Sequence, residues 1–214
     1  NDGVINGFEE GEQFNWRIWD NDAELEAFGF AVYDDEYPEE RYFDSGGASG
    51  LLGSIFASYQ VIPINENPIS DWDMISTYIS TDESVASLLT PIFNELIIFK
   101  SPAGEVYWPL ADINQFTENG LDNMDSYSIK TYGPNDLTIY GDFIQPEQLD
   151  FEFTGWNHIS YPRYFPESVD VLFAELVLSG NLKLLKDDSG NIYWPDLGIN
   201  TINEMEAGEG YLLR

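Results

Sequence analysis

The sequence predicts a mainly β protein with minor α content (α+β). We expect an N-terminal antiparallel β module followed by two tandem homologous repeats, each a small antiparallel sheet with one helix. Three observations predict this fold class. Apolar and polar residues alternate early in the chain, a ten-residue segment occurs twice, and aromatic residues, which favour strands, make up 15% of the 214 residues. The predicted domains are residues 1–60, 61–144 and 145–214.

The N-terminal module, residues 1–60, alternates between apolar and polar side chains with a period of two. Its apolar positions form two runs: Phe14, Trp16 and Ile18, then Phe28, Phe30 and Val32. This period is typical of antiparallel strands that bury one face. Polar, turn-like segments follow the two runs at residues 20–24 and 34–41. We therefore expect an all-β module.

The duplicated segment is residues 100–109, which recurs as residues 186–195. Each copy resembles a hairpin, with an apolar run, a turn containing Gly, an apolar-aromatic run and then Pro. Other residues repeat in the same order, among them Trp72 and Trp156, Glu83 and Glu167, Lys100 and Lys186, and Tyr127 and Tyr211. The repeating unit therefore extends over residues 71–130 and 155–214.

Both repeats are expected to follow one plan, after a proline-containing linker at residues 61–70. A strand at the Trp-x-x-Ile-Ser segment comes first, and a helix and the hairpin follow it. A closing strand then starts at Tyr127 or Tyr211. Residues 137–144 alternate in polarity and predict one more strand, which connects the two repeats.

The helices are predicted at residues 82–93 and 166–178, where apolar side chains recur at helical spacing. Pro166 would be the first helical residue of the second copy, because proline at this position loses no hydrogen bond. In the first copy Thr81 or Ser80 would cap the helix.

The net charge of −31 comes from 39 acidic and 8 basic residues, and together with the apolar runs and the cysteine count it narrows the classes of partner and site. Nucleic-acid binding needs clustered Lys and Arg to neutralise phosphates, so we expect no nucleic-acid partner. No apolar run approaches the length of a membrane span, so no transmembrane segment is predicted. The absence of Cys removes disulfides and thiolate metal sites.

No enzymatic activity is predicted. His158 is the only histidine, so a zinc site or a Ser-His-Asp triad would depend on it, and no nucleophile-elbow pattern surrounds any Ser. Paired carboxylates such as those of glycoside hydrolases need one partner in an apolar pocket, and no acidic pair here has an apolar context.

Oxygen-rich loops are candidate sites for a structural Ca²⁺ ion, which prefers carboxylate and carbonyl ligands. The first candidate set is Asp20, Asp22 and Glu24, and the second is Asp187, Asp188 and Asn191. Neither matches an EF-hand loop, and hairpin-turn chemistry alone explains the second.

Exposed aromatic rings are candidate platforms for carbohydrate, because sugar faces stack on flat rings. The candidates are Tyr107, Trp108, Tyr193, Trp194 and Trp19. In each adjacent Tyr-Trp pair, the two rings are expected to point to opposite faces of a strand. Packing in the core or between modules is the alternative role for all five rings.

Two motifs resemble modules of known proteins. The second repeat has Gly-Trp-Asn-x-Ile-Ser at residues 155–160, Tyr-Trp-Pro-x-x-Gly-Ile-Asn at 193–200 and Gly-x-Gly-Tyr at 208–211. It looks like a module of large secreted proteins of Bacteroidota-type bacteria, and residues 7–20 are similar to the β module that often precedes it. Such proteins commonly carry a type IX sorting tail, so the resemblance implies an extracellular, cell-surface location. The first repeat departs from the pattern, with Asp112 where the second has Gly198.

Three functions are compatible with these features. The first is a non-catalytic extracellular module of a bacterial surface protein, which serves adhesion or binds a polysaccharide or cell-surface glycan. The second is a self-assembling structural subunit, of a filament or surface layer, that associates through sheet edges. The third is an accessory domain of a secreted hydrolase. We also expect the natural polypeptide to continue beyond Asn1, Arg214 or both.

Overall fold

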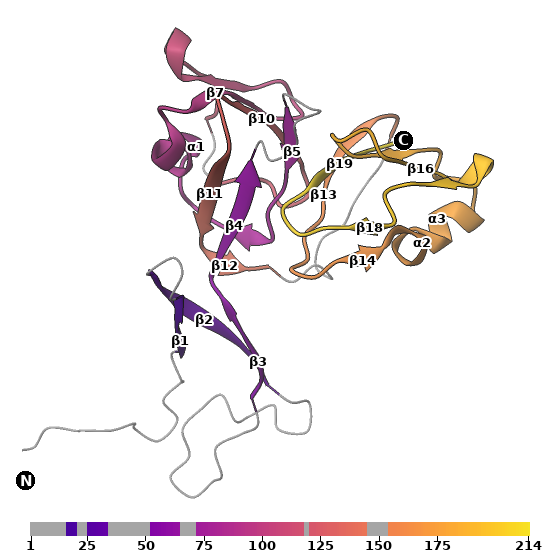
Figure 1. The fold of residues 1–214 in the computed structure, drawn as a ribbon, viewed down its shortest axis with the longest axis horizontal. Helices are drawn as coiled ribbons and strands as arrows, with labels where there is room; N and C mark the ends of the chain where they lie inside the picture. Colours follow the sequence, from indigo (N-terminus) through magenta and orange to yellow (C-terminus); the bar gives the residue numbers. More distant parts are fainter. Residues whose placement is uncertain (1–15, 21–24, 34–51, 65–71, 118–119, 145–153) are drawn as a thin grey trace, which may run out of the picture. The chain divides into compact units, whose positions relative to one another are not determined.

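The computed structural model describes residues 16–20, 25–33, 52–64, 72–117, 120–144 and 154–214 (Figure 1). The chain divides into two compact units, Asn1–Ser58 and Tyr59–Arg214. Strands dominate both units and the helices are short. The predicted fold class, mainly β with minor α, is therefore confirmed.

The first unit contains one antiparallel sheet. Its strands are β1 (Trp16–Asp20), β2 (Leu25–Tyr33) and β3 (Leu52–Ala57), in the spatial order β1-β2-β3. Gly29 pairs with Trp16 across the β1–β2 ladder, and a Cβ atom at Gly29 would lie 2.8 Å from the side chain of Ile55. Because Gly29 has no side chain, Trp16 of β1 and Ile55 of β3 can lie close to its backbone.

The second unit contains the same five-stranded sheet twice. The first sheet consists of β5 (Asp73–Ile75), β7 (Leu96–Lys100), β8 (Val106–Trp108), β9 (Ile113–Asn114) and β10 (Tyr127–Thr131). The second consists of β13 (Asn157–Ser160), β15 (Leu185–Lys186), β16 (Ile192–Trp194), β17 (Ile199–Asn200) and β19 (Gly210–Leu213). The orders β5-β10-β7-β8-β9 and β13-β19-β15-β16-β17 correspond strand by strand.

Each hairpin continues into a 3-10 helix, η2 (Pro109–Ala111) or η4 (Pro195–Leu197), that ends in a left-handed residue. That residue is Asp112 (φ 54°) in the first repeat and Gly198 (φ 65°) in the second. Its backbone N–H donates to the carbonyl oxygen of Pro109 or Pro195, at 3.0 Å in both repeats. The turn is thus the same in both repeats, although only the second has the residue that fits a left-handed backbone without strain.

Replacing Asp112 by Gly is expected to stabilise the protein by about 0.5–1 kcal/mol, because Asp has a steric cost in this backbone conformation that Gly lacks. Urea unfolding of the two proteins measures the change. Gly198→Asp should shift the free energy of unfolding in the opposite direction. A loss of stability on Asp112→Gly would contradict the prediction.

The helices are shorter than the sequence predicts. The helical residues are α1 (Val85–Leu88) with η1 (Thr90–Ile92), and α2 (Val169–Leu172) with α3 (Ala174–Leu178). In the second repeat the strand β14 (Glu167–Ser168) pairs with β18 (Glu204–Met205), so Pro166 does not begin a helix. In the first repeat the cap is neither Thr81 nor Ser80, because the Ser84 side chain accepts the hydrogen bond from the N–H of Ser87.

The expected linker is a strand over its first residues. Strand β4 (Tyr59–Ile64) pairs along its length with β11 (Asn135–Tyr140), and β6 (Ile79–Ser80) pairs with β12 (Asp142–Phe143). The single strand predicted at residues 137–144 is therefore two strands. Pro63 lies within β4, opposite Asp136, and residues 65–71 lie outside the described part of the chain.

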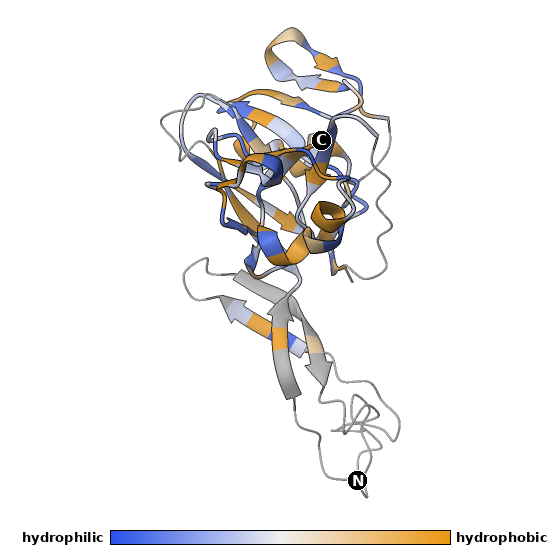
Figure 2. Ribbon diagram, turned by 90° about the vertical axis from the view of Figure 1, so that its right-hand side faces the viewer, coloured by the Kyte–Doolittle hydropathy of each residue, from blue (hydrophilic) through white to orange (hydrophobic). Residues whose placement is uncertain are grey.

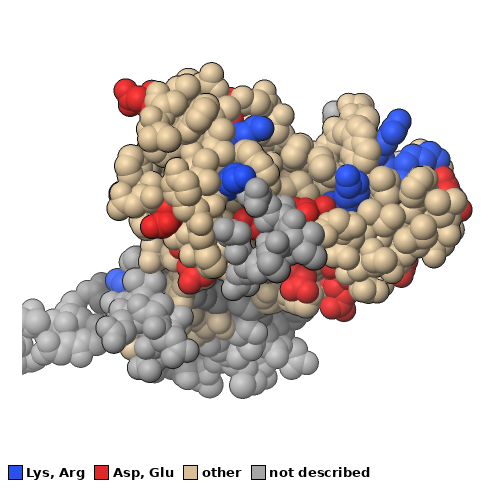
Figure 3. All heavy atoms as spheres, turned by 45° about the horizontal axis from the view of Figure 1, so that its top comes forward, with Lys and Arg blue, Asp and Glu red and all other residues tan. Residues whose placement is uncertain are grey.

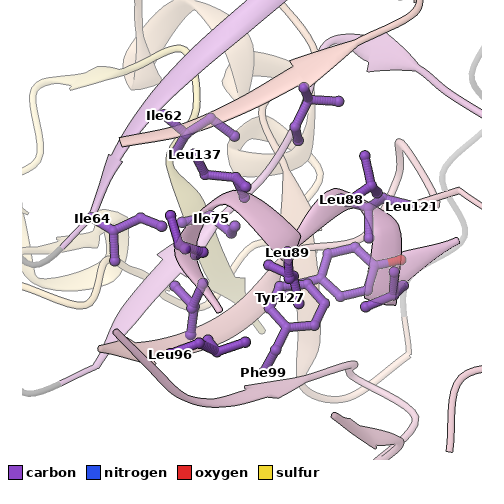
Figure 4. Close-up of a cluster of buried hydrophobic side chains, with 14 of the residues drawn as sticks. Ile62, Ile64, Ile75, Leu88, Leu89, Leu96, Phe99, Leu121, Tyr127 and Leu137 are labelled. Carbon is purple, nitrogen blue, oxygen red and sulfur yellow. The ribbon is translucent and has the colours of Figure 1, made fainter. Parts of the chain in front are cut away.

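Each repeat has a separate hydrophobic core. The first combines the sheet and helical segment of repeat 1 with β4 and β11. Figure 4 shows Ile62 and Leu137 of these two strands in one cluster with Leu89, Phe99 and Tyr127. The second core lies within repeat 2 and consists of Ile159, Tyr161, Val169, Phe173, Leu182, Leu185, Tyr193, Met205, Tyr211 and Leu213.

The two repeats contact each other reciprocally. The N–H of Ser76 donates to the carbonyl oxygen of Gly208 at 2.8 Å, and the N–H of Ser160 donates to that of Met124 at 3.0 Å. Ser76 is equivalent to Ser160, and Met124 to Gly208, so the same pair of bonds forms in both directions. This is the pattern of a two-fold interface between identical subunits, here built within one chain.

Candidate functional site

The outer faces of the two five-stranded sheets, opposite the cores, carry the candidate site. Burial alternates along β10, where Tyr127, Ile129 and Thr131 are buried and Ser128 and Lys130 are partly exposed. Successive side chains of a strand point to opposite faces, so strand register determines which residues share the outer face.

In repeat 2 this register aligns five residues across the sheet, two within strands and three one residue beyond a strand end. Arg214 and Leu184 exchange two backbone hydrogen bonds, of 2.8 and 3.0 Å, and Trp194 pairs with Ile199. The Leu185–Tyr193 pair places Trp194 beside Leu184, and the Asn157–Leu213 pair places Trp156 beside Arg214. We call this set the second indole row: Trp156, Arg214, Leu184, Trp194 and Ile199.

Repeat 1 has the equivalent row. Lys130 pairs with Ile98, and Trp108 with Ile113. The Ile129–Asp73 pair places Trp72 beside Lys130, and the Phe99–Tyr107 pair places Trp108 beside Ile98. The first indole row is therefore Trp72, Lys130, Ile98, Trp108 and Ile113.

The second Trp of each row is exposed to a similar degree. Trp108 is 40% exposed and Trp194 is 37% exposed, with Ile113 and Ile199 beside them at 37% and 36%. Figure 2 shows hydrophobic residues on the hairpin of repeat 1, at the top of the view. A flat indole face and a neighbouring aliphatic side chain are thus accessible at the same place in both repeats.

The first Trp of each row lies under basic groups. The Lys100 Nζ atom is 5.1 Å from the centre of the Trp72 ring, and the Lys186 Nζ atom is 5.9 Å from the centre of the Trp156 ring. The Arg214 guanidinium also lies 5.7 Å from the centre of the Trp156 ring. These are cation–π distances, so each row combines aromatic surface with positive charge.

The aromatic residues singled out in the sequence occupy different environments. Trp108 and Trp194 lie on the outer faces, whereas Tyr193 is 6% exposed in the second core and Tyr107 packs against the first core. Trp19 is 61% exposed on β1, in the first unit. Trp72 and Trp156 were not among the predicted site residues, although both belong to the repeated motif and precede a strand by one residue.

The predicted calcium ligands are only partly described. Asp22 and Glu24 lie outside the described residues, and only the backbone of Asp20 is described, at the end of β1. In the second set, Asp187 accepts hydrogen bonds from the Asn191 backbone and side chain at 2.7 Å, and Asp188 accepts one from the Met74 backbone at 2.7 Å. Among the side chains that the structure describes, no group of three or more His, Cys, Asp or Glu has a metal-binding arrangement.

Carboxylates also gather where the two repeats meet. A pocket of about 270 Å³ is lined by residues of both repeats, which include Asp73, Asp187, Asp188, Glu204, Glu206 and Glu209. Burial, followed by the charges of Asp188 and its acidic neighbours, raises the pKa of Glu209 to about 7. The equivalent residue of repeat 1 is Asp125, and burial and Asp122 raise its pKa to about 6.

Comparisons with protein-family models, curated protein sequences and solved structures find no match for this chain. None of the helices in the described ranges is long and apolar enough to cross a membrane. The interpretation of the site therefore depends on its own geometry, which offers two equivalent apolar, aromatic surfaces with positive charge beside them.

Proposed function

We propose that this chain is a non-catalytic, carbohydrate-binding module of an extracellular bacterial surface protein, and that the two indole rows bind the ligand. The observation that carries the proposal is the nearly equal exposure of Trp108 and Trp194 at equivalent positions of the two repeats. Burying a Trp side chain gives a large hydrophobic stabilisation, so an exposed indole forgoes part of it. A binding role explains why both copies present the ring.

Carbohydrate fits these rows better than an unspecified apolar partner does. A sugar ring has one flat apolar face that stacks on an indole, and its hydroxyl groups need hydrogen-bond donors and acceptors nearby. Each row supplies the indole together with a basic side chain, Lys130 or Arg214. Two rows on one chain would also bind two stretches of one polysaccharide, which raises the apparent affinity without new contacts.

Replacing both Trp108 and Trp194 by Ala is expected to weaken polysaccharide binding at least tenfold, because the stacking surface is lost from both rows (about 1.4 kcal/mol for each tenfold). The free energy of unfolding should fall by about 2–4 kcal/mol in total and the fold should be kept, since both rings are partly in water already. Affinity electrophoresis and urea unfolding measure the two quantities.

Phe93→Ala is the matched control. Phe93 is 47% exposed and follows η1, away from the outer face of the sheet. Its removal should leave binding unchanged. The proposal fails if the Trp108→Ala/Trp194→Ala protein binds as well as the original, or if it loses its fold and so shows that the rings serve packing.

Self-association through sheet edges is the rival function. The edge strands β9 and β17 are two residues long, and a second chain could form few backbone hydrogen bonds with either. A negative charge of this size also opposes the approach of two copies. The charge of the chain and these two short edges therefore favour the binding module over the filament or surface-layer subunit.

A further inference from the structure

Basic residues are rare in this chain, and half of them belong to the outer faces. The sequence has eight Lys and Arg against 39 Asp and Glu. Four of the eight are Lys100, Lys130, Lys186 and Arg214, which occupy two pairs of equivalent positions in the repeats. Figure 3 shows Lys and Arg side chains in two groups on one face of the second unit, one group over each repeat.

Three of these residues, Lys100, Lys186 and Arg214, differ in their surroundings from Arg163 and Lys183, the two other basic residues of repeat 2. Arg163 forms an ion pair with Glu167 at 2.7 Å, and Lys183 lies 3.8 Å from a carboxylate oxygen of Asp196. Lys186 and Arg214, by contrast, lie over the Trp156 ring, and Lys100 lies over Trp72. A cation over an indole keeps N–H groups that can still donate to an anion at the ring edge.

The strand positions of the outer faces hold no Asp or Glu, within the residues that the structure describes. In the first sheet the outer positions are Met74, Ile98, Lys100, Val106, Trp108, Ile113, Ser128 and Lys130. In the second they are His158, Ser160, Lys186, Ile192, Trp194, Ile199, Gly210 and Leu212, with Leu184 and Arg214 paired beyond the strand ends. The strand positions of both faces therefore carry positive and no negative side chains, and Asp188 accepts a hydrogen bond from the Met74 backbone where the two repeats meet.

The charge of Lys100 in the first repeat also reaches a residue of the second repeat. Burial lowers the pKa of His158 in β13, and the ammonium group of Lys100 in β7 lowers it further. Lys100 of the first outer face therefore lies near a residue of the second. A single elongated ligand could meet the charges of both rows.

We propose that the indole rows bind an anionic polysaccharide, one that carries carboxylate or sulfate groups. This inference rests on the proposed function and specifies its ligand. The sugar rings would stack on Trp108 and Trp194. The acidic groups would lie against Lys130 of the first row and the neighbouring Lys100, and against Arg214 of the second row and the neighbouring Lys186. Charge-assisted hydrogen bonds from Lys and Arg to such groups are stronger than those between neutral partners.

The test is isothermal titration calorimetry of the full chain with three polysaccharides: polygalacturonate, a sulfated galactan and neutral galactan. We expect at least one anionic ligand to bind about tenfold more tightly than the neutral one at low salt. That difference should shrink as NaCl rises, because salt screens the attraction. Non-specific attraction would not explain this result, since a chain of charge −31 repels polyanions as a whole.

The variant Lys100→Gln/Lys186→Gln tests whether these two lysines cause the preference for anionic ligands. It should bind the anionic ligand about tenfold more weakly and lower any affinity for neutral galactan much less. Lys183→Gln is the control, because it removes an exposed positive charge that is paired with Asp196 outside the rows. Lys183→Gln should therefore not change the affinity.

The outcomes separate the two proposals. If neutral galactan binds as tightly as the anionic ligands and depends on Trp108 and Trp194, the anionic ligand is refuted while the carbohydrate-binding function stands. If neither Lys100→Gln/Lys186→Gln nor NaCl weakens binding of an anionic ligand, the inference is likewise refuted. If none of the three polysaccharides binds, both proposals fail for these sugars. Preference for polygalacturonate or for the sulfated galactan identifies the acidic group.

Discussion

Replacing Gly210 by Ser is expected to destabilise the second unit by about 3 kcal/mol, because Gly210 has no room for a side chain. A Cβ atom at this position would lie 2.4 Å from the Ser126 Cβ atom and 3.1 Å from the backbone carbonyl carbon of Met74. Neither neighbour can rotate away, since one is a Cβ atom and the other is backbone. Urea unfolding of the full chain measures the loss.

Ser126 makes this prediction specific to the reciprocal interface. Gly210 and Ser126 are equivalent residues of the two repeats, and they face each other where the repeats are in contact. Only one of the two positions can therefore carry a side chain. The combined variant Ser126→Gly/Gly210→Ser should recover part of the lost stability, as a double-mutant cycle would show.

Gly133→Ser is the control, because a Cβ atom at Gly133 would have no neighbour within 4 Å. It should change the free energy of unfolding by less than about 0.5 kcal/mol. The explanation fails if Gly210→Ser is equally mild. It also fails if Ser126→Gly does nothing to offset Gly210→Ser.

Much of the fold could be predicted because the duplication leaves a signal in local sequence. The hairpins at residues 100–109 and 186–195 keep their turn, and the strands that follow keep their Tyr-Trp pair, so residue types alone indicate both sheets. The helices were predicted too long because Glu167 and Ser168 pair with β18, a tertiary contact that helical spacing does not reveal. The prediction of a linker at residues 61–70 was wrong for the same reason: residues 61–64 belong to strand β4, which forms through its pairing with β11.

The candidate site was predicted only in part. Alternation along a strand correctly separates Trp108 from Tyr107 and Trp194 from Tyr193. It does not show which residues of different strands are neighbours, because neighbours across a sheet depend on register. Trp72, Lys130 and Ile98 are far apart in sequence and become one row only through the order β5-β10-β7. The cations beside the indoles could therefore not be deduced without the structure.

Duplication also places a partly buried carboxylate at equivalent positions, Asp125 and Glu209, each just before the repeated closing strand. In repeat 2 the backbone at Glu209 belongs to the interface, because its carbonyl oxygen accepts a 2.6 Å hydrogen bond from the Ser76 hydroxyl. Its side chain lies in the acidic pocket that both repeats line. Charge at Glu209 is therefore coupled to the contact between the repeats.

Stability is expected to fall as pH rises from about 4.5 to about 7, by about 2 kcal/mol from Glu209 alone. The pKa of Glu209 is raised from 4.5 to about 7 in the folded protein, so the folded state keeps a proton that the unfolded state releases in this range. The stabilisation is complete below the unfolded pKa and is lost as pH rises through the folded pKa. Burial is the main cause, and Asp188, Asp73, Asp187 and Glu206 add repulsion.

Glu209→Gln should remove this part of the pH dependence, because glutamine stays neutral. The variant should exceed the original protein in free energy of unfolding at pH 8 and differ little from it at pH 4.5, in urea unfolding at both values. Glu175→Gln, an exposed change on α3, should leave the pH profile intact. Equal profiles for the original protein and Glu209→Gln would show that the pocket does not hold a proton in the folded state. A flattened profile would mean that charge repulsion at the junction of the repeats depends on pH in the neutral range.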